Sequence, residues 1–252
     1  MERGLKAQDI LWVWEHGQQS SPPRRALLLW MAARPECDGL ALAELPLGQR
    51  EAGLLRARER TFGPRLEVVV TCPGCQERLE FELNTREERA DAPQGPPEAG
   101  FELEVEGFRM QLRLPNTADI LAIEHLRDAE NARRALFARC LESAERGGDR
   151  VLAEGIPSAL IGRVAGAMHA RDPQAESLHP LDCPLCGHHW EAAFEIGDYF
   201  WREVEAHARR LLREVDQLAR AYGWREDEIL GLSALRRRAY LEMTASFGSN
   251  AR

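Results

Sequence analysis

Lysine is almost absent from this chain: Lys6 is the only one, although 33 of the 252 residues are Lys or Arg. The arginines alternate with Asp and Glu along segments of helical periodicity, and the formal net charge is −8. A surface that binds nucleic-acid phosphates needs a concentrated basic face, which this pattern does not provide. Interleaved charges are typical of solvated, salt-bridged helix faces, so nucleic acid is a disfavoured partner.

Long apolar segments are also missing. The run at residues 26–33 is far shorter than the roughly 20 residues that span a bilayer. No basic segment leads into an apolar stretch with a small-residue cleavage site, so we expect no signal peptide. Six cysteines, four of them in metal-binding spacing, indicate a reducing compartment rather than a disulfide scaffold. The sequence therefore predicts a soluble protein made and used in the cytoplasm.

The sequence motifs of common enzymes are absent as well. The chain has no GxSxG, P-loop, dinucleotide-binding or HExxH motif. His125, His169 and His207 stand singly on expected helices, which is typical of surface or core histidines. Asp198 precedes a long helical segment and is better explained as its N-cap than as a base. Nothing in the sequence indicates catalysis, and we predict that the protein is not an enzyme.

What the chain does contain is a pair of Cys-Pro-x-Cys segments, one starting at Cys72 and the other at Cys183. Both are embedded in sequence that alternates apolar and polar residues, as strands do. A two-residue gap at a tight turn lets two thiolates bind one cation, and four sulfurs complete a closed tetrahedral zinc site. Gly74 or Gly187 is expected to supply a positive φ angle beside the metal. The spacing predicts one structural Zn²⁺ ion with four ligands: Cys72, Cys75, Cys183 and Cys186.

Two alternatives to a shared zinc site stay open. Separate half-sites would be completed by His179, His188 or His189, and a CxxC pair can also be a redox dithiol. A redox pair is expected at a helix N-terminus, whereas both pairs here precede strands. Cys37 and Cys140 lie outside the pattern and are expected to be buried or idle thiols. A closed four-cysteine site has no open coordination position, so it would build structure and perform no chemistry.

The pattern of the remaining segments predicts an α+β fold, in which a small zinc-ribbon-like β unit is split by a long insertion and flanked by helices. Strands 101–106 and 108–114 form a hairpin-type signal in the insertion. Helices are expected at 117–129, 132–144, 158–170 and, longest of all, 199–222. We divide the chain into an N-terminal helical segment (1–62), two halves of the zinc-ribbon unit (63–83 and 178–196), a linker (84–100), a hairpin-plus-helix insertion (101–177) and a C-terminal helical region (197–252).

The C-terminal region carries the residue types that dominate interfaces, because Trp, Tyr and Arg supply most hot spots. The candidate partner surface consists of Tyr222, Trp224, Arg236, Arg237, Arg238 and Tyr240. The alternative is a helical corner in which Trp224 and Tyr240 pack locally and the arginines are solvated. The sequence alone does not decide between these two interpretations.

The same C-terminal string resembles a signature of small baseplate proteins, which are encoded with myophage tails and with the contractile injection systems derived from them. It consists of a long helix followed by Tyr-Gly-Trp, Glu-x-Glu-Ile-Leu, Leu-Ser and Arg-Arg-x-x-Tyr-Leu. The resemblance extends over residues 45–63, the first CPxC pair, the strand 108–114 with its Pro-Asn-Thr-Ala-Asp sequel, and the second pair leading into Phe200-Trp201. Many phage relatives lack the cysteine pairs, so the zinc site is a departure from that family pattern.

This resemblance implies a structural or assembly role in a baseplate, without catalysis. The implied partners are other baseplate or tail proteins of the hub, spike or wedge, and the implied location is a tail or injection-system particle. A zinc-ribbon adaptor in nucleic-acid machinery is the alternative, which the net acidity and the absence of basic-aromatic strands disfavour. A thiol oxidoreductase is the third hypothesis.

Overall fold

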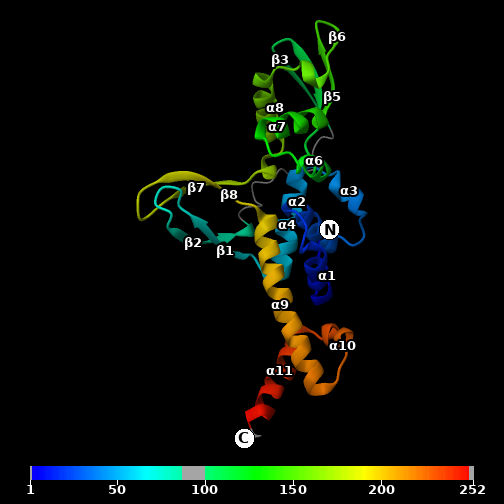
Figure 1. The fold of residues 1–252 in the computed structure, drawn as a ribbon, viewed down its shortest axis with the longest axis vertical. Coiled ribbons are helices and arrows are strands. Elements are labelled where there is room, and N and C mark those ends of the chain that lie inside the picture. Colours follow the sequence, from blue (N-terminus) through cyan, green and yellow to red (C-terminus); the bar gives the residue numbers. More distant parts are fainter. Residues whose placement is uncertain (1, 87–99, 250–252) are drawn as a thin grey trace.

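The computed structural model describes residues 2–86 and 100–249, and Figure 1 shows them as a central helical body with three projections. A second lobe lies beyond one end of the body, a pair of β-hairpins projects from its side, and a helical corner extends from its other end. Residues 87–99 of the predicted linker at 84–100 lie outside the described residues. No described helix is both long and apolar enough to cross a bilayer.

Four helices build the central body: α1 (Ala7–Gly17), α2 (Pro22–Ala33), α4 (Leu47–Phe62) and α9 (Ile196–Tyr222). The short α3 (Gly39–Ala43) follows α2. As predicted, α9 has an apolar side at helical spacing, and Phe200, Val204 and Leu211 on it are fully buried. They share one core with Trp30 of α2 and Leu54 of α4. Full burial of each such side chain stabilises the fold by roughly 1.5–3 kcal/mol.

The start of α9 differs from the sequence prediction. The helix begins at Ile196, its N-cap is Glu195, and Asp198 lies inside the first turn. The prediction that Asp198 is the N-cap is therefore wrong. A carboxylate in the first turn is still favourable, because the helix dipole places positive partial charge there.

The second lobe has its own hydrophobic core. Four strands form an antiparallel sheet in the order β3 (Phe101–Val105), β4 (Phe108–Leu112), β5 (Leu141–Arg146) and β6 (Asp149–Arg150). The helices α7 (Ala129–Cys140) and α8 (Ser158–Arg171) supply Phe137, Leu160 and Val164 to the core under this sheet. The predicted hairpin of the insertion is present as β3 and β4, with Phe101 opposite Leu112.

The helix predicted at residues 132–144 is wrong over its last four residues. α7 ends at Cys140, and the chain continues as β5, which pairs with β4. Gly147 and Gly148, at φ angles of 61° and 93°, then turn the chain into β6. Strand pairing to β4 buries Ala144 in the lobe, and this contact with a distant segment overrides the local helical pattern.

The helix predicted at 117–129 is likewise shorter than expected. α6 (Thr117–Ile123) ends six residues earlier, and Asp128 instead caps α7 by accepting a hydrogen bond from the Asn131 N–H at 2.8 Å. The side chain of an N-cap aspartate satisfies one of the unpaired amides of the first turn.

Two separate two-stranded sheets form the side projection (Figure 1). β1 (Arg65–Thr71) pairs with β2 (Arg78–Asn84), and β7 (Leu178–Asp182) pairs with β8 (His189–Ala193). Small antiparallel sheets combined with many helices confirm the α+β class. The finer division of the chain into the segments given above stays a prediction.

At the far end of α9, the helices α10 (Glu226–Gly231) and α11 (Ala234–Ser249) fold back against it. Gly223 ends α9 in the left-handed conformation, at a φ angle of 69°, which glycine adopts without steric cost. The described chain thus ends in a helical corner that stands apart from the second lobe (Figure 1).

Candidate metal centre

The two Cys-Pro-x-Cys loops have the same backbone hydrogen bonds. The Cys72 N–H donates to Glu77 O, and the Cys183 N–H donates to His188 O, both at 2.9 Å. In return, the carbonyl of Cys72 accepts from the N–H four residues later, and so does that of Cys183. Each loop is therefore a rigid connection between two strands, which places both of its thiols on one side.

The left-handed residue of each loop follows the second cysteine. It is Gly187, at a φ angle of 71°, in one loop and Gln76, at 64°, in the other. The prediction holds for Gly187, whereas Gly74 has no positive φ. Gly74 serves another purpose, since a Cβ atom there would stand only 2.9 Å from Cβ of His188 in the opposite loop.

The four thiols meet between the loops. The Sγ atoms of Cys72 and Cys186 are 3.7 Å apart, those of Cys75 and Cys183 are 3.6 Å apart, and all four lie within 4.8 Å of one another. Four sulfurs at about 2.3 Å from a tetrahedral Zn²⁺ ion are about 3.8 Å apart. The separations are far from a disulfide bond of about 2.0 Å. The thiols are free, and their spacing fits a metal ion held by both loops.

Backbone amides favour the thiolate at Cys183, whereas at Cys75 and Cys186 their effect is outweighed by desolvation and the neighbouring thiols, which raise the pKa. Cys72 and Cys183 are buried, Cys75 is half-buried and Cys186 is exposed. The backbone N–H of Cys186 hydrogen-bonds to the sulfur of Cys183 and lowers the pKa of that thiol to about 7. A thiolate is the form that binds a metal. The cluster can hold a metal ion.

The three alternative ligands have other contacts, and His188 stacks on Trp190. His179 contacts Ser177 Oγ through Nε2 at 3.0 Å, and His189 contacts Asp182 through Nδ1 at 2.9 Å. Among the residues that the structure describes, the four-cysteine group is the sole cluster of three or more His, Cys, Asp or Glu side chains with metal-binding spacing.

Two further thiols lie outside this centre. Cys140 is buried at the end of α7, where desolvation, followed by the charge of Asp119, raises the pKa of its thiol to about 12. Cys37 is half-buried beside the core of the helical body. Cys140 is therefore protonated at neutral pH and buried, as the sequence predicted.

The predicted partner surface is partly structural. Tyr222 and Trp224 stack with ring centroids 4.6 Å apart, and Trp224 meets Tyr240 edge-on at 4.8 Å. Arg237 is buried, where it donates to Glu214 at 3.1 Å and to the carbonyl of Leu232 at 2.9 Å. Its assignment to an exposed surface is therefore wrong, because its guanidinium closes the corner between α9 and α11. Arg236 and Arg238 are exposed.

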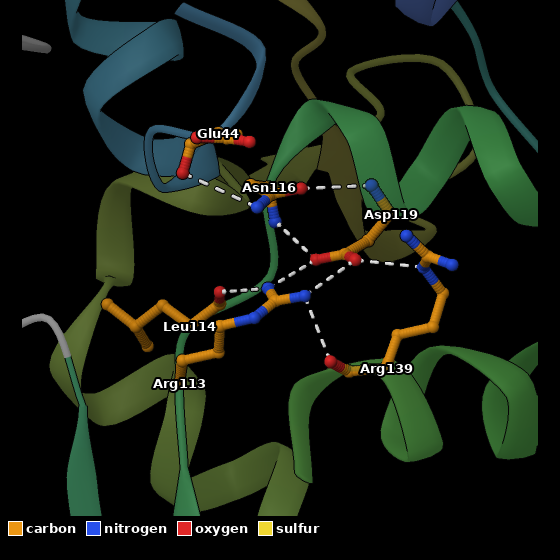
Figure 2. Close-up of polar contacts among 6 residues, drawn as sticks. All are labelled: Glu44, Arg113, Leu114, Asn116, Asp119 and Arg139. Carbon is orange, nitrogen blue, oxygen red and sulfur yellow. Dashed lines mark hydrogen bonds and ion pairs between the residues drawn. The ribbon is translucent and has the colours of Figure 1, made fainter. Parts of the chain in front are cut away.

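Sequence reasoning missed a buried polar junction between the lobes (Figure 2). Asp119 of α6 is 1% exposed and accepts hydrogen bonds from Arg113 at 2.5 and 2.8 Å and from Arg139 at 2.8 Å. Asn116 caps α6 and donates to the carbonyl of Glu44 in the helical body at 3.3 Å. The Pro-Asn-Thr-Ala-Asp sequence predicted the helix cap. It did not indicate that two arginines would bind the carboxylate of Asp119.

Other contacts complete this junction at the start of α4. The N–H of Leu47 donates to Pro115 O at 3.1 Å, and the N–H of Gly48 donates to the buried Asp172 at 2.9 Å. Burial raises the pKa of Asp172, against the effect of the Gly48 amide. A side chain at position 48 would collide with Asp172. The second lobe is thus fixed to the body by polar contacts.

Comparison with known proteins gives one match. A family model described as T4 bacteriophage base plate protein matches residues 36–201. No curated protein and no solved structure matches the chain. The matched residues include α4, both hairpins with their four cysteines, the entire second lobe and the first turns of α9. Because the match covers about two thirds of the 252 residues, the chain belongs to the T4 bacteriophage base plate protein family.

Proposed function

We propose that this protein is a non-catalytic structural or assembly component of the baseplate of a contractile tail or injection system. The observation that carries the proposal is the family match, which extends through the hairpins, the second lobe and the junction between the lobes. A rigid junction suits such a role, because subunits of a large assembly must present surfaces in a fixed relation. The partners would be other baseplate or tail proteins of the hub, spike or wedge, and the protein would be made in the cytoplasm before it joins a particle.

The bound metal would be Zn²⁺, held by Cys72, Cys75, Cys183 and Cys186. Four thiolates in a closed site match the preference of zinc, and such sites contribute folding energy directly. When bound, the ion would connect two loops that lie on either side of the inserted lobe in the sequence. It would therefore hold the hairpins in a fixed relation to each other and to α9.

The alternative, an adaptor in nucleic-acid machinery, is disfavoured by the charges of the hairpins. Their exposed side chains include Glu67, Glu80, Glu82, Asp182 and Glu191. A carboxylate-rich surface repels phosphates and does not release counterions as a basic one does.

Native mass spectrometry of the tagged protein, purified from its own host, tests these proposals. We expect one zinc ion per chain and co-purifying tail or baseplate subunits. Co-purification of nucleic acid or polymerase subunits would favour the adaptor. A metal-free chain with oxidised cysteine pairs would contradict the zinc site, and a wild-type chain absent from purified particles and from their assembly intermediates would contradict the baseplate role.

A further inference from the structure

The free edge of β1 is an unused set of hydrogen-bonding groups. β1 pairs with β2 alone, and the bonds from Thr85 N to Pro64 O and from Cys72 N to Glu77 O bracket this ladder. Antiparallel partners alternate between pairs that exchange both bonds and pairs that exchange none. The even-numbered residues of β1 therefore face β2. The N–H and C=O groups of Arg65, Glu67, Val69 and Thr71 point away from it.

This edge borders a groove rather than open solvent. The groove measures about 560 Å³ and lies between β1, α4 and α9. Its apolar wall includes Phe62, Val69 and Tyr199. The Tyr199 hydroxyl donates to the carbonyl of Val69 at 3.4 Å, the sole hydrogen bond from the described residues to this row of edge groups. A hydrogen bond of that length is weak, so the row is nearly unpaired.

The free edges of β7 and β2 are protected, in contrast. The bonds from Cys183 N to His188 O and from Phe194 N to Ser177 O set the register of β7 and β8. By the same alternation, Pro180 lies on the free edge of β7, where it offers no N–H. The free edge of β2 includes Glu80 and Glu82, and charged side chains or proline on an edge prevent strand addition. The β1 edge has charged residues in its first half alone, at Arg65 and Glu67, and continues with the 37%-exposed Val69 and with Thr71.

We propose that the β1 edge receives an extended segment of another baseplate protein, which adds to β1 as a third strand. This inference rests on the baseplate role proposed above. Alternating N–H and C=O groups along an edge are complementary to another extended backbone, which is the principle of β-strand addition. Two copies of this chain cannot pair edge to edge through β1, because each β1 edge is flanked by the α4 and α9 of its own chain.

The groove also indicates the side chains of the incoming segment. An apolar residue of that segment would contact Phe62, Val69 and Tyr199. Arg202 lies over the Tyr199 ring at 5.5 Å and has no carboxylate partner among the residues that the structure describes. An acidic residue at the α9 side of the segment would pair with it. The metal centre lies next to this site, since Cys72 directly follows the last edge residue of β1.

Two proline substitutions at directly opposite positions test the proposal. Val69 and Glu80 are cross-strand partners whose N–H groups both point away from the hairpin. Val69→Pro removes one amide from the β1 edge, and Glu80→Pro removes one from the β2 edge, with no loss of a hydrogen bond within the hairpin in either case. Val69→Ala keeps the amide and reports on the side chain alone.

The probes are overlapping 12-residue synthetic peptides that cover the other baseplate proteins encoded with this chain. Binding to the zinc-loaded full-length protein is measured by fluorescence anisotropy. We expect one segment, present in several overlapping peptides, to bind the wild type and Glu80→Pro equally. It should bind Val69→Pro at least about tenfold more weakly, because loss of one edge amide also leaves a carbonyl of the peptide without its hydrogen-bond donor. The peptide affinity of Val69→Ala should lie between those of the wild type and Val69→Pro.

Three outcomes would overturn the inference: no peptide binds, Val69→Pro binds as the wild type does, or Glu80→Pro weakens binding as much as Val69→Pro. Particle incorporation of the same variants separates this inference from the baseplate role. If Val69→Pro enters purified particles as well as the wild type does, strand addition is refuted and the baseplate role is not. A wild type that enters neither particles nor their assembly intermediates would refute the baseplate role itself.

Discussion

Gln76 and Gly187 occupy equivalent left-handed positions in the two cysteine loops, and only one of them is the residue that this conformation favours. A non-glycine residue at positive φ costs roughly 1–2 kcal/mol. The cost persists at Gln76 because the two hydrogen bonds of the loop, and the thiol cluster beside it, fix the backbone there. The metal centre therefore fixes the left-handed backbone conformation of Gln76 as well as the positions of the cysteine side chains.

The cysteine ligands lead to the first prediction. Cys72→Ser and Cys183→Ser should each reduce bound zinc from about one ion per chain to nearly none and lower the unfolding free energy by several kcal/mol, because metal binding contributes to folding. Metal analysis and thermal unfolding check this. Cys37→Ser, which changes a half-buried thiol outside the cluster, is the matched control and should keep its zinc. Wild-type stability in Cys72→Ser would refute the shared site.

Asp119 gives a second prediction at the same scale. Its burial raises the pKa of the carboxyl, but the hydrogen bonds from Arg113, Asn116 and Arg139 outweigh that effect and lower the pKa below its ordinary value of 3.8. Asp119→Asn should cost about 2 kcal/mol near pH 7, because it leaves the partly exposed Arg113 and Arg139 without their buried carboxylate partner. Chemical denaturation measures the difference. Asp128→Asn, the same change at an exposed helix cap, should cost less than about 0.5 kcal/mol, since Asn and Asp cap equally well.

The pH dependence of the Asp119 contribution follows from the lowered pKa. A carboxyl whose pKa is lower in the folded state than in the unfolded state stabilises the fold above its unfolded pKa. This stabilisation is lost as the pH falls through the folded pKa. The stability gap between wild type and Asp119→Asn should thus be constant from neutral pH to about pH 5 and shrink below the ordinary value of 3.8. A gap that shrinks near pH 6 would contradict the assignment.

At the scale of elements, the C-terminal corner has features of both interpretations of its sequence, a locally packed corner and an exposed surface with arginines. The rings of Tyr222, Trp224 and Tyr240 pack on one another, while Arg236 and Arg238 stay exposed. Arg237 joins α11 to α9 through Glu214. Three consecutive arginines in the sequence therefore have different roles, which depend on the face of α11 that each occupies.

Alanine substitutions in this triplet provide the third prediction. Arg237→Ala should destabilise the corner by about 2 kcal/mol, because it leaves Glu214 and the Leu232 carbonyl without their donor. Arg238→Ala removes an exposed pair with Glu242 and should cost less than about 0.5 kcal/mol. Hydrogen exchange of the amides in α10 and α11 distinguishes the two. Equal protection in both variants would show that Arg237 does not hold the corner.

At the scale of the whole molecule, two hydrophobic cores are joined by polar contacts, and the hairpins are attached to only one of them. Leu66 and Val68 of β1 and Phe194 after β8 belong to the core of the helical body, whereas the core of the second lobe draws on residues 101–164. The family match includes the whole second core and part of the first, so the proposed baseplate role involves the relation between them.

Removal of the metal yields the fourth prediction. A chelator should increase hydrogen exchange in β1, β2, β7 and β8, because the closed thiolate site ties their loops together. The amides of β3, β4 and β5 should keep their protection, since they belong to a separate core. Exchange mass spectrometry with and without the chelator measures this. Uniform loss of protection throughout the chain would mean that the two lobes unfold as one unit.

The sequence by itself determined the features that depend on local spacing. The two CPxC pairs, the apolar side of α9 and the strands β3 and β4 were all readable, because a turn, a helix and a hairpin each impose a short period on the chain. The baseplate family was likewise readable from residues 45–63, the two CPxC pairs and the strand 108–114, which lie within the matched residues 36–201, whereas the C-terminal string lies beyond them.

Only the tertiary structure decided the features that arise between distant segments. β5 exists because β4 offers it a partner, Arg237 is buried because Glu214 lies opposite it, and Asp119 is ionised between two arginines from different elements. The open edge of β1 also depends on the packing of α4 and α9, which turns a strand of ordinary sequence into the wall of a groove. Such properties are set by long-range packing, which no local period encodes.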